Sequence, residues 1–394
     1  MAVNILIMIY KSRFTKFHYE SREIDYLKGY CKVKILDLSE LLKEKKEIQR
    51  KKIDTDEVLE IKSFLDLNKY FKTTYSQKKN IYVINFIEYP ESIKDIIFFC
   101  ILRYYKYKSN FILIRNNNPG HIREEKLLGN SNPVIRVLKT STSSKELYLR
   151  MKSFTYGLLL KIIRCKEDYE FLAGSDWDIS EKNNKVKKIY GHSIDYSRHL
   201  REPPRILQRK KNYAVFLDNP SPNQIGDASL SGWKIYATGQ KYYPSLRNFF
   251  DYIEYNFDIN ILISGHIKTE YPVKLEIFGN RNIIYGETKD LIYNSIMILN
   301  RASTAVGYAM LYSKPIIYLY SDEIKNDIHD MNTINNFQLA TGGDIVNIDD
   351  YQTWPKFIPD INLDKSEEYI RRCMSTCKNK GPNYKVFIKE IMGN

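Results

Sequence analysis

The chain has 394 residues, of which 43% are hydrophobic and 27% are charged, and its formal net charge at pH 7 is +14. This composition excludes an intrinsically disordered chain, and the length is sufficient for two domains of ordinary size. The positive charge favours an anionic partner. Because the basic residues are scattered and form no nucleic-acid-binding motif, we rank an anionic ligand and a membrane surface above nucleic acid.

The cysteines indicate a reducing compartment. Their number is odd and their spacing irregular: Cys31, Cys100, Cys165, Cys373 and Cys377. The last two lie one helical turn apart, but no second pair completes a zinc site. We see no signal peptide, and no apolar run approaches the ~20 residues that span a bilayer. We therefore expect a cytoplasmic location, with peripheral contact between the basic protein and the anionic inner membrane.

The first half of the chain alternates strand and helix patterns. Apolar runs predict strands at residues 3–10, 33–36, 81–87, 110–114, 170–172 and 187–190. Helical patterns lie between them, at 24–30, 41–70, 92–105 and in a long amphipathic helix from Ser143 or Ser144 to about Cys165. This alternation predicts a doubly wound α/β domain.

A second α/β domain follows a linker. Residues 202–212 contain two adjacent prolines and then a basic run, which is typical of a linker. Strands are predicted at 213–218, 259–263, 283–285, 296–299, 316–319 and 345–348, and Pro244 is expected to open a helix. We place the domains at 1–205 and 206–394. The helical segment from Ser366 onward is expected to pack back on the first domain.

Residues 301–320 predict a turn, a short helix and a buried strand. Ser303 and Thr304 stand where the helix would begin, and either could cap it. Free N–H groups and the helix dipole would suit a phosphate at that place. The alternative is an ordinary capped helix, which is the commoner meaning of an isolated Ser-Thr pair.

Two polar residues follow predicted strands of the second domain. Asp218 ends the strand 213–218 beneath a polar loop, where a carboxylate could act as nucleophile or base. The alternative is an aspartate that only caps the loop. His266 follows the strand 259–263 beside Lys268, and both could contact a phosphate or a sugar carboxylate. The alternative for His266 is a solvated loop histidine.

Other candidates are weaker. Glu287 and Thr288 follow the strand 283–285; we favour a helix cap there, although the same surface would line a nucleotide pocket. His192 and Asp195 follow a strand of the first domain and are candidates for an acceptor side. We find no metal-ligand spacing, no P-loop and no dinucleotide fingerprint, so we expect neither a metal nor a cofactor.

The order of several segments resembles the retaining β-Kdo glycosyltransferases of bacterial surface polysaccharide assembly. The segments are Tyr-Ala-Val-Phe-Leu-Asp at 213–218, Tyr-Tyr-Pro-Ser-Leu-Arg-Asn-Phe-Phe at 242–250, residues 261–266, Gly-Glu-Thr-Lys-Asp-Leu at 286–291, Ala-Ser-Thr-Ala-Val at 302–306 and Lys-Pro-Ile-Ile at 314–317. The resemblance covers mainly residues 213–319, and more faintly 188–200.

The resemblance implies a GT-B-like fold, in which two Rossmann-type domains face a central cleft. It also implies transfer of Kdo, an acidic keto-sugar, from CMP-Kdo to a glycan acceptor of lipopolysaccharide, O-antigen or capsule, on a lipid carrier. The domain 1–205 would bind the acceptor, and 206–394 would bind the CMP-sugar. The implied mechanism is a double displacement in which Asp218 becomes glycosylated.

Individual residues match the family to different degrees. Ser303 and Thr304 match its phosphate-binding helix start, and its His-Pro-Arg-like turn is here His266-Ile-Lys268. The family's His-Pro-Asp after the nucleophile is replaced by Gln224-Ile-Gly-Asp227, which removes a histidine. This departure leaves open a related CMP-ulosonate donor or a different acceptor.

Two alternatives stay open at this point. The first is a GT-B transferase that uses another nucleotide sugar and in which Asp218 is structural. The second is a non-catalytic protein that binds polyanions or membranes on this fold, for which the scattered positive charge would be the reason.

Overall fold

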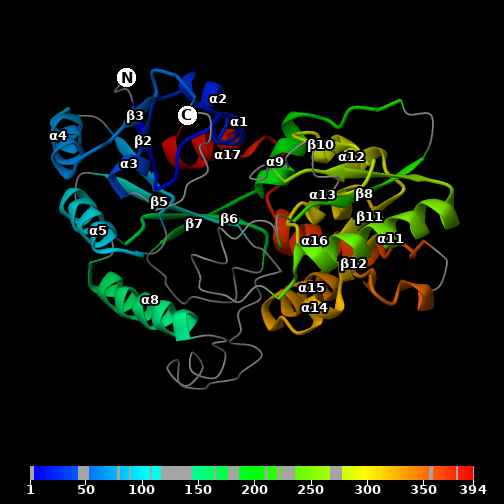
Figure 1. Ribbon diagram of the computed structural model, residues 1–394. Helices are drawn as coiled ribbons and strands as arrows, with labels where there is room; N and C mark the ends of the chain where they lie inside the picture. The colour runs from blue at the N-terminus through cyan, green and yellow to red at the C-terminus, as the bar shows by residue number, and fades with distance from the viewer. Residues whose placement is uncertain are drawn as a thin grey trace. The chain divides into compact units, whose positions relative to one another are not determined.

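The computed structural model describes residues 4–42, 53–77, 80–87, 90–106, 109–116, 144–163, 166–175, 186–208, 212–219, 222, 236–266, 277–354, 358–378 and 380–393 (Figure 1). They form two compact units, each built around one sheet. The first unit takes the described residues within Met1–Asn116, Tyr148–Arg198 and Thr376–Asn394. The second takes those within Asn117–Leu147 and His199–Ser375.

The sheet of the first unit has the strand order β3-β2-β1-β4-β5-β6-β7, and all its neighbours are parallel. The strands are β1 (Ile5–Tyr10), β2 (Lys32–Asp37), β3 (Val58–Glu60), β4 (Ile81–Asn85), β5 (Asn110–Asn116), β6 (Tyr169–Ala173) and β7 (Lys187–Gly191). The chain builds outward from β1 in one direction and then, from β4, in the other. The strand order therefore reverses between β1 and β4.

Both faces of this sheet are covered, as the apolar runs predict. Successive residues of β1 alternate between two hydrophobic clusters, because side chains on a strand alternate in direction. Ile5, Ile7 and Ile9 join the cluster formed with α4, α5 and α8. Leu6, Met8 and Tyr10 join the cluster that contains the C-terminal segment 384–392. The end of the chain is thus part of the first unit's core.

The sheet of the second unit has the order β10-β9-β8-β11-β12-β13, again all parallel. Its strands are β8 (Tyr213–Leu217), β9 (Asn260–Ser264), β10 (Ile283–Ile284), β11 (Met297–Asn300), β12 (Ile316–Tyr320) and β13 (Asp344–Asn347). All five residues of β8 are buried, and the Phe216 ring lies 5.2 Å from that of Phe250 in α11.

The described helices connect these strands. They are α1 (Lys16–Ser21), α2 (Ile24–Lys28), α3 (Ser39–Leu42), α4 (Phe64–Tyr75), α5 (Ile93–Tyr105), α8 (Ser144–Ile163), α9 (Ile194–Arg201), α11 (Gly239–Phe257), α12 (Thr288–Asn294), α13 (Val306–Leu311), α14 (Asp322–Lys325), α15 (Ile328–Thr341), α16 (Leu363–Tyr369) and α17 (Asn383–Phe387). In the part of the chain that the structure describes, none of them is long and apolar enough to cross a membrane.

The predicted fold class is confirmed for each of the two units, since each is built on a parallel α/β sheet of Rossmann type. The boundary between the units falls within α9, at Arg198–His199, and the chain returns to the first unit at Ser375–Thr376. The predicted cleft between two domains stays a prediction, as does the division at residue 205.

Two local predictions are wrong. The charged region 41–70 is predicted to be mostly helical, but it contains the strand β3. This strand pairs with the end of β2 at the edge of the sheet, so its backbone forms hydrogen bonds there. Pro244 lies inside α11, because burial of Tyr242 and Tyr243 draws the preceding turn into the helix. The C-terminal segment is largely helical, as predicted: α16 continues into a π-helical turn that ends at Met374, and α17 begins just after Pro382.

Candidate functional site

The strand order of the second sheet reverses between β8 and β11. In open parallel sheets, ligands bind at such a switch point, beyond the carboxyl ends of the strands. The register places Leu217, the last residue of β8, beside Ser264 of β9 on one side and Asn300 of β11 on the other. The residues that directly follow these three strands therefore meet at one edge of the sheet.

Asp218 is the residue that follows β8. Its side chain is buried, with an exposed fraction of 4%. Its backbone N–H donates to the carbonyl of Ser264 at 3.1 Å and so extends the ladder by one residue. One carboxylate oxygen, Oδ2, accepts the backbone N–H of His266 at 3.3 Å. The structure thus brings together the two residues that the sequence predicted as catalytic, Asp218 and His266.

Gly265 explains how His266 comes so close. Its N–H donates to the carbonyl of Ile284 at 2.9 Å, which draws the chain tightly against β10. A Cβ at this position would lie 2.5 Å from the ring of Tyr285 and 2.8 Å from Ile283. Glycine therefore lets the strand end turn toward Asp218 without displacing these neighbours.

Arg301, which follows β11, supplies a buried positive charge at the same edge. Its exposed fraction is 1%, and its guanidinium forms an ion pair with Asp330 of α15. The guanidinium also lies 5.4 Å from the centre of the Tyr242 ring of α11. A buried charge requires such partners, so this arrangement fixes the guanidinium in place.

The charges of this cluster act on one another. Burial raises the pKa of Tyr242 above its usual value; the Arg301 guanidinium acts in the opposite direction, and the negative charge of Asp218 adds to the rise. Burial alone would lower the pKa of Arg301, but Asp330 and Tyr242 more than reverse this effect. Arg301 and Asp218 therefore both act on the pKa of Tyr242, in opposite directions.

The turn after β11 is held by Asn300, which is fully buried. Its side-chain oxygen accepts the N–H of Ser303 at 2.9 Å, and its amide donates to the Ser303 carbonyl at 3.3 Å. Neither Ser303 nor Thr304 is the N-cap residue of the next helix, although the Ser303 hydroxyl accepts the backbone N–H of Ala305 at 3.4 Å. The helix α13 begins at Val306 with Ala305 as its N-cap residue, because the turn that Asn300 closes uses up the preceding residues.

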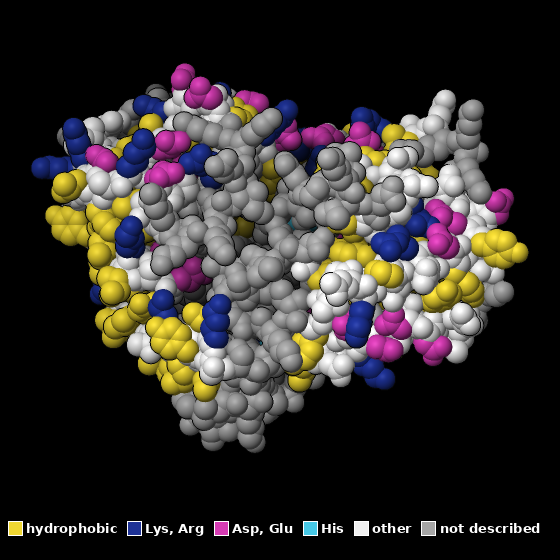
Figure 2. All heavy atoms as spheres, viewed as in Figure 1, with side chains coloured by type: hydrophobic (Ala, Val, Ile, Leu, Met, Phe, Trp, Pro, Cys, Tyr) yellow, Lys and Arg dark blue, Asp and Glu magenta, His cyan; other side chains and the backbone are white. Residues whose placement is uncertain are grey.

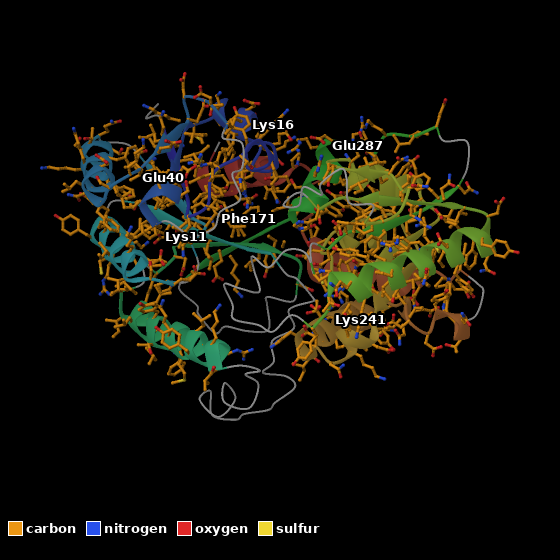
Figure 3. All side chains as sticks on the ribbon, viewed as in Figure 1. Lys11, Lys16, Glu40, Phe171, Lys241 and Glu287 are labelled. Carbon is orange, nitrogen blue, oxygen red and sulfur yellow. The ribbon has the colours of Figure 1, made fainter. Side chains whose placement is uncertain are left out.

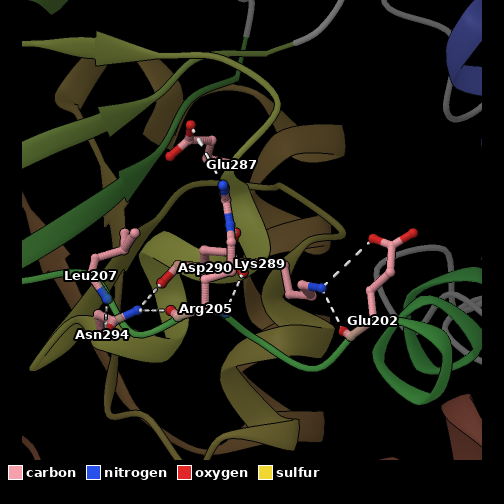
Figure 4. A network of polar contacts seen from close by, with 7 residues as sticks. All are labelled: Glu202, Arg205, Leu207, Glu287, Lys289, Asp290 and Asn294. Carbon is pink, nitrogen blue, oxygen red and sulfur yellow. Dashed lines mark hydrogen bonds and ion pairs between the residues drawn. The ribbon is translucent and has the colours of Figure 1, made fainter.

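Thr288 and Glu287 point to different partners. The Thr288 hydroxyl lies 2.8 Å from the hydroxyl of Ser264 at the end of β9, so Thr288 reaches the edge that carries Asp218. Neither side chain caps α12, which corrects the favoured prediction: Glu287 is the N-cap residue, but its side chain makes no capping hydrogen bond. One Glu287 oxygen instead lies 3.7 Å from a guanidinium nitrogen of Arg205 (Figure 4).

The segment 202–207 is attached to α12 by polar contacts (Figure 4). Asp290 accepts both the backbone N–H of Arg205, at 3.0 Å, and its side-chain Nε, at 2.7 Å. Asn294 accepts the N–H of Leu207 at 3.0 Å, and the buried Lys289 ammonium donates to the carbonyl of Glu202 at 2.6 Å. The proline-bearing linker is therefore ordered against the second unit.

The remaining predicted site residues lie elsewhere. His192, with an exposed fraction of 1%, belongs to the first unit. Its ring Nε2 lies 3.1 Å from the carbonyl of Gly381, and its backbone N–H and carbonyl both bond the side chain of Asn383. These contacts attach the C-terminal segment to the first unit. Asp195 lies in the first turn of α9. Lys268 and Asp227 lie outside the described residues.

The sequence did not reveal Arg301, Tyr242 or Asp330 as members of this cluster. Arg301 follows a buried apolar strand at once, and this placement was the available signal for a buried cation. Tyr242 stands in a segment quoted for the family resemblance, but no role was assigned to it. Within the described ranges, no group of three or more His, Cys, Asp or Glu side chains could hold a metal ion.

Comparisons with known proteins give structural likenesses only. No family model matches the sequence, and no curated protein is similar to it. A structure of a variant of the wall teichoic acid polymerase TagF has a TM-score of 0.49 at 11% identity, covering 98% of this chain and 88% of that one. UDP-GlcNAc 2-epimerase from Neisseria meningitidis, bound to UDP-GlcNAc, has a TM-score of 0.45 at 13% identity, covering 100% of both chains.

The glycosyltransferase SnogD from Streptomyces nogalater also has a TM-score of 0.45, at 8% identity and 100% coverage of both chains. At such identities and scores, none of these likenesses indicates what this chain binds or transforms. The fold follows instead from the strand order and register of the two sheets.

Proposed function

We propose that the chain is a retaining glycosyltransferase that moves Kdo, or a related ulosonic acid, from a CMP-activated donor to a glycan acceptor. The observation that carries the proposal is the buried carboxylate of Asp218 at the switch point of the second sheet, in contact with His266. The family resemblance supplies the donor and the double displacement, and the local geometry supports the residue assignment.

In this mechanism, an Asp218 carboxylate oxygen attacks the anomeric carbon of the donor. The bond from that carbon to the CMP phosphate oxygen breaks, and CMP leaves with the bonding electrons. The acceptor hydroxyl then attacks the same carbon, loses its proton, and displaces the Asp218 carboxylate. Two successive inversions restore the original anomeric configuration.

The other predicted site residues have supporting roles in the proposal. His266 and Lys268 would stabilise the negative charge that develops on the departing phosphate, together with Ser303 and Thr304. Thr288 would line the nucleotide side of the pocket, since its hydroxyl already contacts the end of β9. Glu287 keeps a weaker assignment, because its carboxylate contacts Arg205.

Acceptor binding is assigned to the first unit. His192 and Asp195 were the sequence candidates for it, and Asp195 is the stronger of the two in this proposal. The buried ring of His192 contacts the carbonyl of Gly381, which is a structural arrangement. The acceptor glycan on its lipid carrier and the location at the inner membrane, in lipopolysaccharide or capsule assembly, belong to the same proposal.

A donor panel tests the choice of sugar nucleotide. Purified protein is incubated with CMP-Kdo generated in situ, or with UDP-, GDP- and CDP-sugars, in the presence of a mixture of surface-polysaccharide fragments. We expect transfer from the CMP donor alone, with β-configured product by NMR. Transfer only from another nucleotide sugar would favour a different GT-B transferase, and an inverted product would exclude the double displacement.

A further inference from the structure

The helix α8 exposes an apolar stripe along its whole length. Six large hydrophobic side chains are solvent-exposed on this one helix: Tyr148, Met151, Phe154, Leu158, Leu159 and Ile162. At about 100° of rotation per residue, they occupy a continuous arc of about 140°. The opposite side of the helix, which includes the buried Leu160, packs into the first unit's core. The helix therefore has two apolar faces, of which one is buried and the other exposed.

Basic residues flank the exposed arc on both sides. At the same rotation per residue, Lys152 lies just beyond one border of the arc, and Arg150 and Lys161 lie just beyond the other. The Lys152 ammonium lies 5.6 Å from the centre of the Tyr156 ring, on the same border. The helix sequence holds four basic residues and one acidic residue. An apolar stripe with cations on its flanks is the pattern of a helix that lies in a membrane interface.

The neighbouring helix α5 continues this surface. Ile93, Ile97 and Tyr104 are exposed at helical spacing, and a guanidinium nitrogen of Arg103 donates to the carbonyl of Ile162 at the end of α8. Figure 2 shows hydrophobic side chains gathered along the side of the first unit that α5 and α8 form, with Lys and Arg among them. We call the exposed residues of these two helices the α5–α8 face.

We propose that the α5–α8 face docks on an anionic lipid bilayer. The stripe supplies apolar area that would enter the acyl boundary, and the flanking cations would contact lipid phosphates at the same depth. The contact is peripheral, because no described helix could cross a membrane. The proposal names the surface and its partner, and it does not depend on the transfer reaction.

Tyr255 of the second unit is an exposed apolar residue outside this face. Tyr255 of α11 is 88% exposed, but it stands between Glu254 and Asn256 and belongs to the second unit. Isolated exposed apolar side chains are normal on protein surfaces, whereas contiguous stripes mark interaction sites. Tyr255 is therefore a matched control for substitutions on α8.

The test is co-sedimentation of the full-length chain with vesicles. Vesicles of phosphatidylethanolamine with about 30% phosphatidylglycerol are compared with vesicles of pure phosphatidylcholine. At about one anionic lipid in three, the surface charge of the first kind is strong. The apolar variant is Leu158→Glu/Ile162→Glu, and its control is Tyr255→Glu. The charge variant is Lys152→Gln/Lys161→Gln, and its control is Lys241→Gln, a side chain that is 77% exposed in the second unit. Circular dichroism verifies that each variant is folded.

We expect binding to the anionic vesicles only, and weaker binding as salt is raised. The Leu158→Glu/Ile162→Glu variant should lose at least about tenfold in partition coefficient, and the charge variant about fivefold for each charge removed. Both controls should bind like the native protein. Absence of binding by the native protein, or equal binding by the α8 variants and the controls, would overturn the proposal.

A second measurement separates the lipid surface from a protein partner. If another copy of the chain covered the α5–α8 face, the apolar variant would reduce the mass measured by light scattering without lipid. That outcome, together with unchanged vesicle binding, would assign the face to self-association and contradict the bilayer proposal. An unchanged mass with lost vesicle binding supports it.

Discussion

Two buried aspartates, one in each unit, follow or end a parallel strand. Asp37 ends β2 in the first unit and is 2% exposed. Its two carboxylate oxygens accept the backbone N–H groups of Phe14 and Ser39, each at 2.9 Å. Asp218 follows β8 and accepts the N–H of His266 at 3.3 Å, at the long end of normal hydrogen-bond distances. Asp37 is a carboxylate that holds loops; Asp218 stands at the switch point beside other charged groups.

The difference shows why position alone does not distinguish a loop cap from a candidate nucleophile. Both side chains are buried, and both lie at carboxyl ends of strands. The distinguishing features are the partners, because Asp37 satisfies two loop N–H groups, whereas the charge of Asp218 raises the pKa of Tyr242, on which the Arg301 guanidinium acts in the opposite direction.

The charged groups at the two switch points also differ in what they contact. Lys11 follows β1 in the first unit (Figure 3), and its ammonium lies 2.6 Å from a Glu91 oxygen and 3.3 Å from one of Asp95. Asp95 also accepts the N–H groups of Glu91 and Ser92 at the start of α5. This group of charges is organised around a helix start, which agrees with assigning the chemistry to the second unit.

The largest expected effect is on transfer by Asp218→Asn. The amide is nearly isosteric but is a poor nucleophile, so kcat should fall about 10,000-fold. The free energy of unfolding should change by less than about 1 kcal/mol, because the amide oxygen can still accept the His266 N–H. Initial rates and urea unfolding measure the two quantities. Retained turnover in a folded variant would make Asp218 a second loop-holding aspartate.

The next largest effect is on stability, from Arg301→Met. Removing the guanidinium leaves the Asp330 carboxylate, which is 30% exposed, without its buried cationic partner. Because solvent reaches Asp330 in part, the expected cost is about 3 kcal/mol, the lower end of that for breaking a buried pair. Urea unfolding of the double variant Arg301→Met/Asp330→Leu provides the control, which should recover much of the loss. A single variant as stable as the native protein would show that the pair contributes little.

Asp37→Asn should affect stability and leave transfer intact. Its amide NH2 would face one of the two loop N–H groups, so one buried donor loses its acceptor, at a cost of about 1 to 3 kcal/mol. Thermal unfolding and kcat are the measurements. A loss of kcat as large as that in Asp218→Asn would remove the contrast between the two aspartates.

The smallest effect concerns Asp290, which attaches the linker to α12. Burial acts to raise the pKa of Asp290, but the hydrogen bonds from Arg205 outweigh it, and the pKa lies below its usual value of 3.8. A lowered folded-state pKa stabilises the fold above the unfolded-state pKa, and this contribution is lost as the pH falls through the folded-state value. Asp290→Asn should therefore destabilise by about 1 kcal/mol at pH 7, and its difference from the native protein should shrink as the pH falls below 3.8 and through the lower folded-state pKa. A difference independent of pH would contradict this account.

Much of the second unit could be predicted from the sequence, because its strands are short apolar runs bounded by polar residues. Once those runs are parallel neighbours, Asp218 and His266 must meet at one edge, and they do. Arg301 could not be placed in the same way. Its partner Asp330 comes from α15, and only the folded chain brings the two together.

The errors have a common cause. Serine often caps helices, but at Ser303 the buried Asn300 engages the backbone in a turn. Proline is common at the start of a helix, but at Pro244 the buried tyrosines before it extend the helix. In both cases tertiary contacts outweigh local preference, which a reading of the sequence alone does not reveal.

Intact-protein mass spectrometry after incubation with CMP-Kdo, without acceptor, tests whether Asp218 is the nucleophile. We expect a mass increase of one Kdo residue that maps to the peptide carrying Asp218, occurs equally in Asp37→Asn, and is absent in Asp218→Asn. No adduct in a native preparation that transfers Kdo once acceptor is added, or an adduct that persists in Asp218→Asn, would contradict the assignment of Asp218 as the nucleophile.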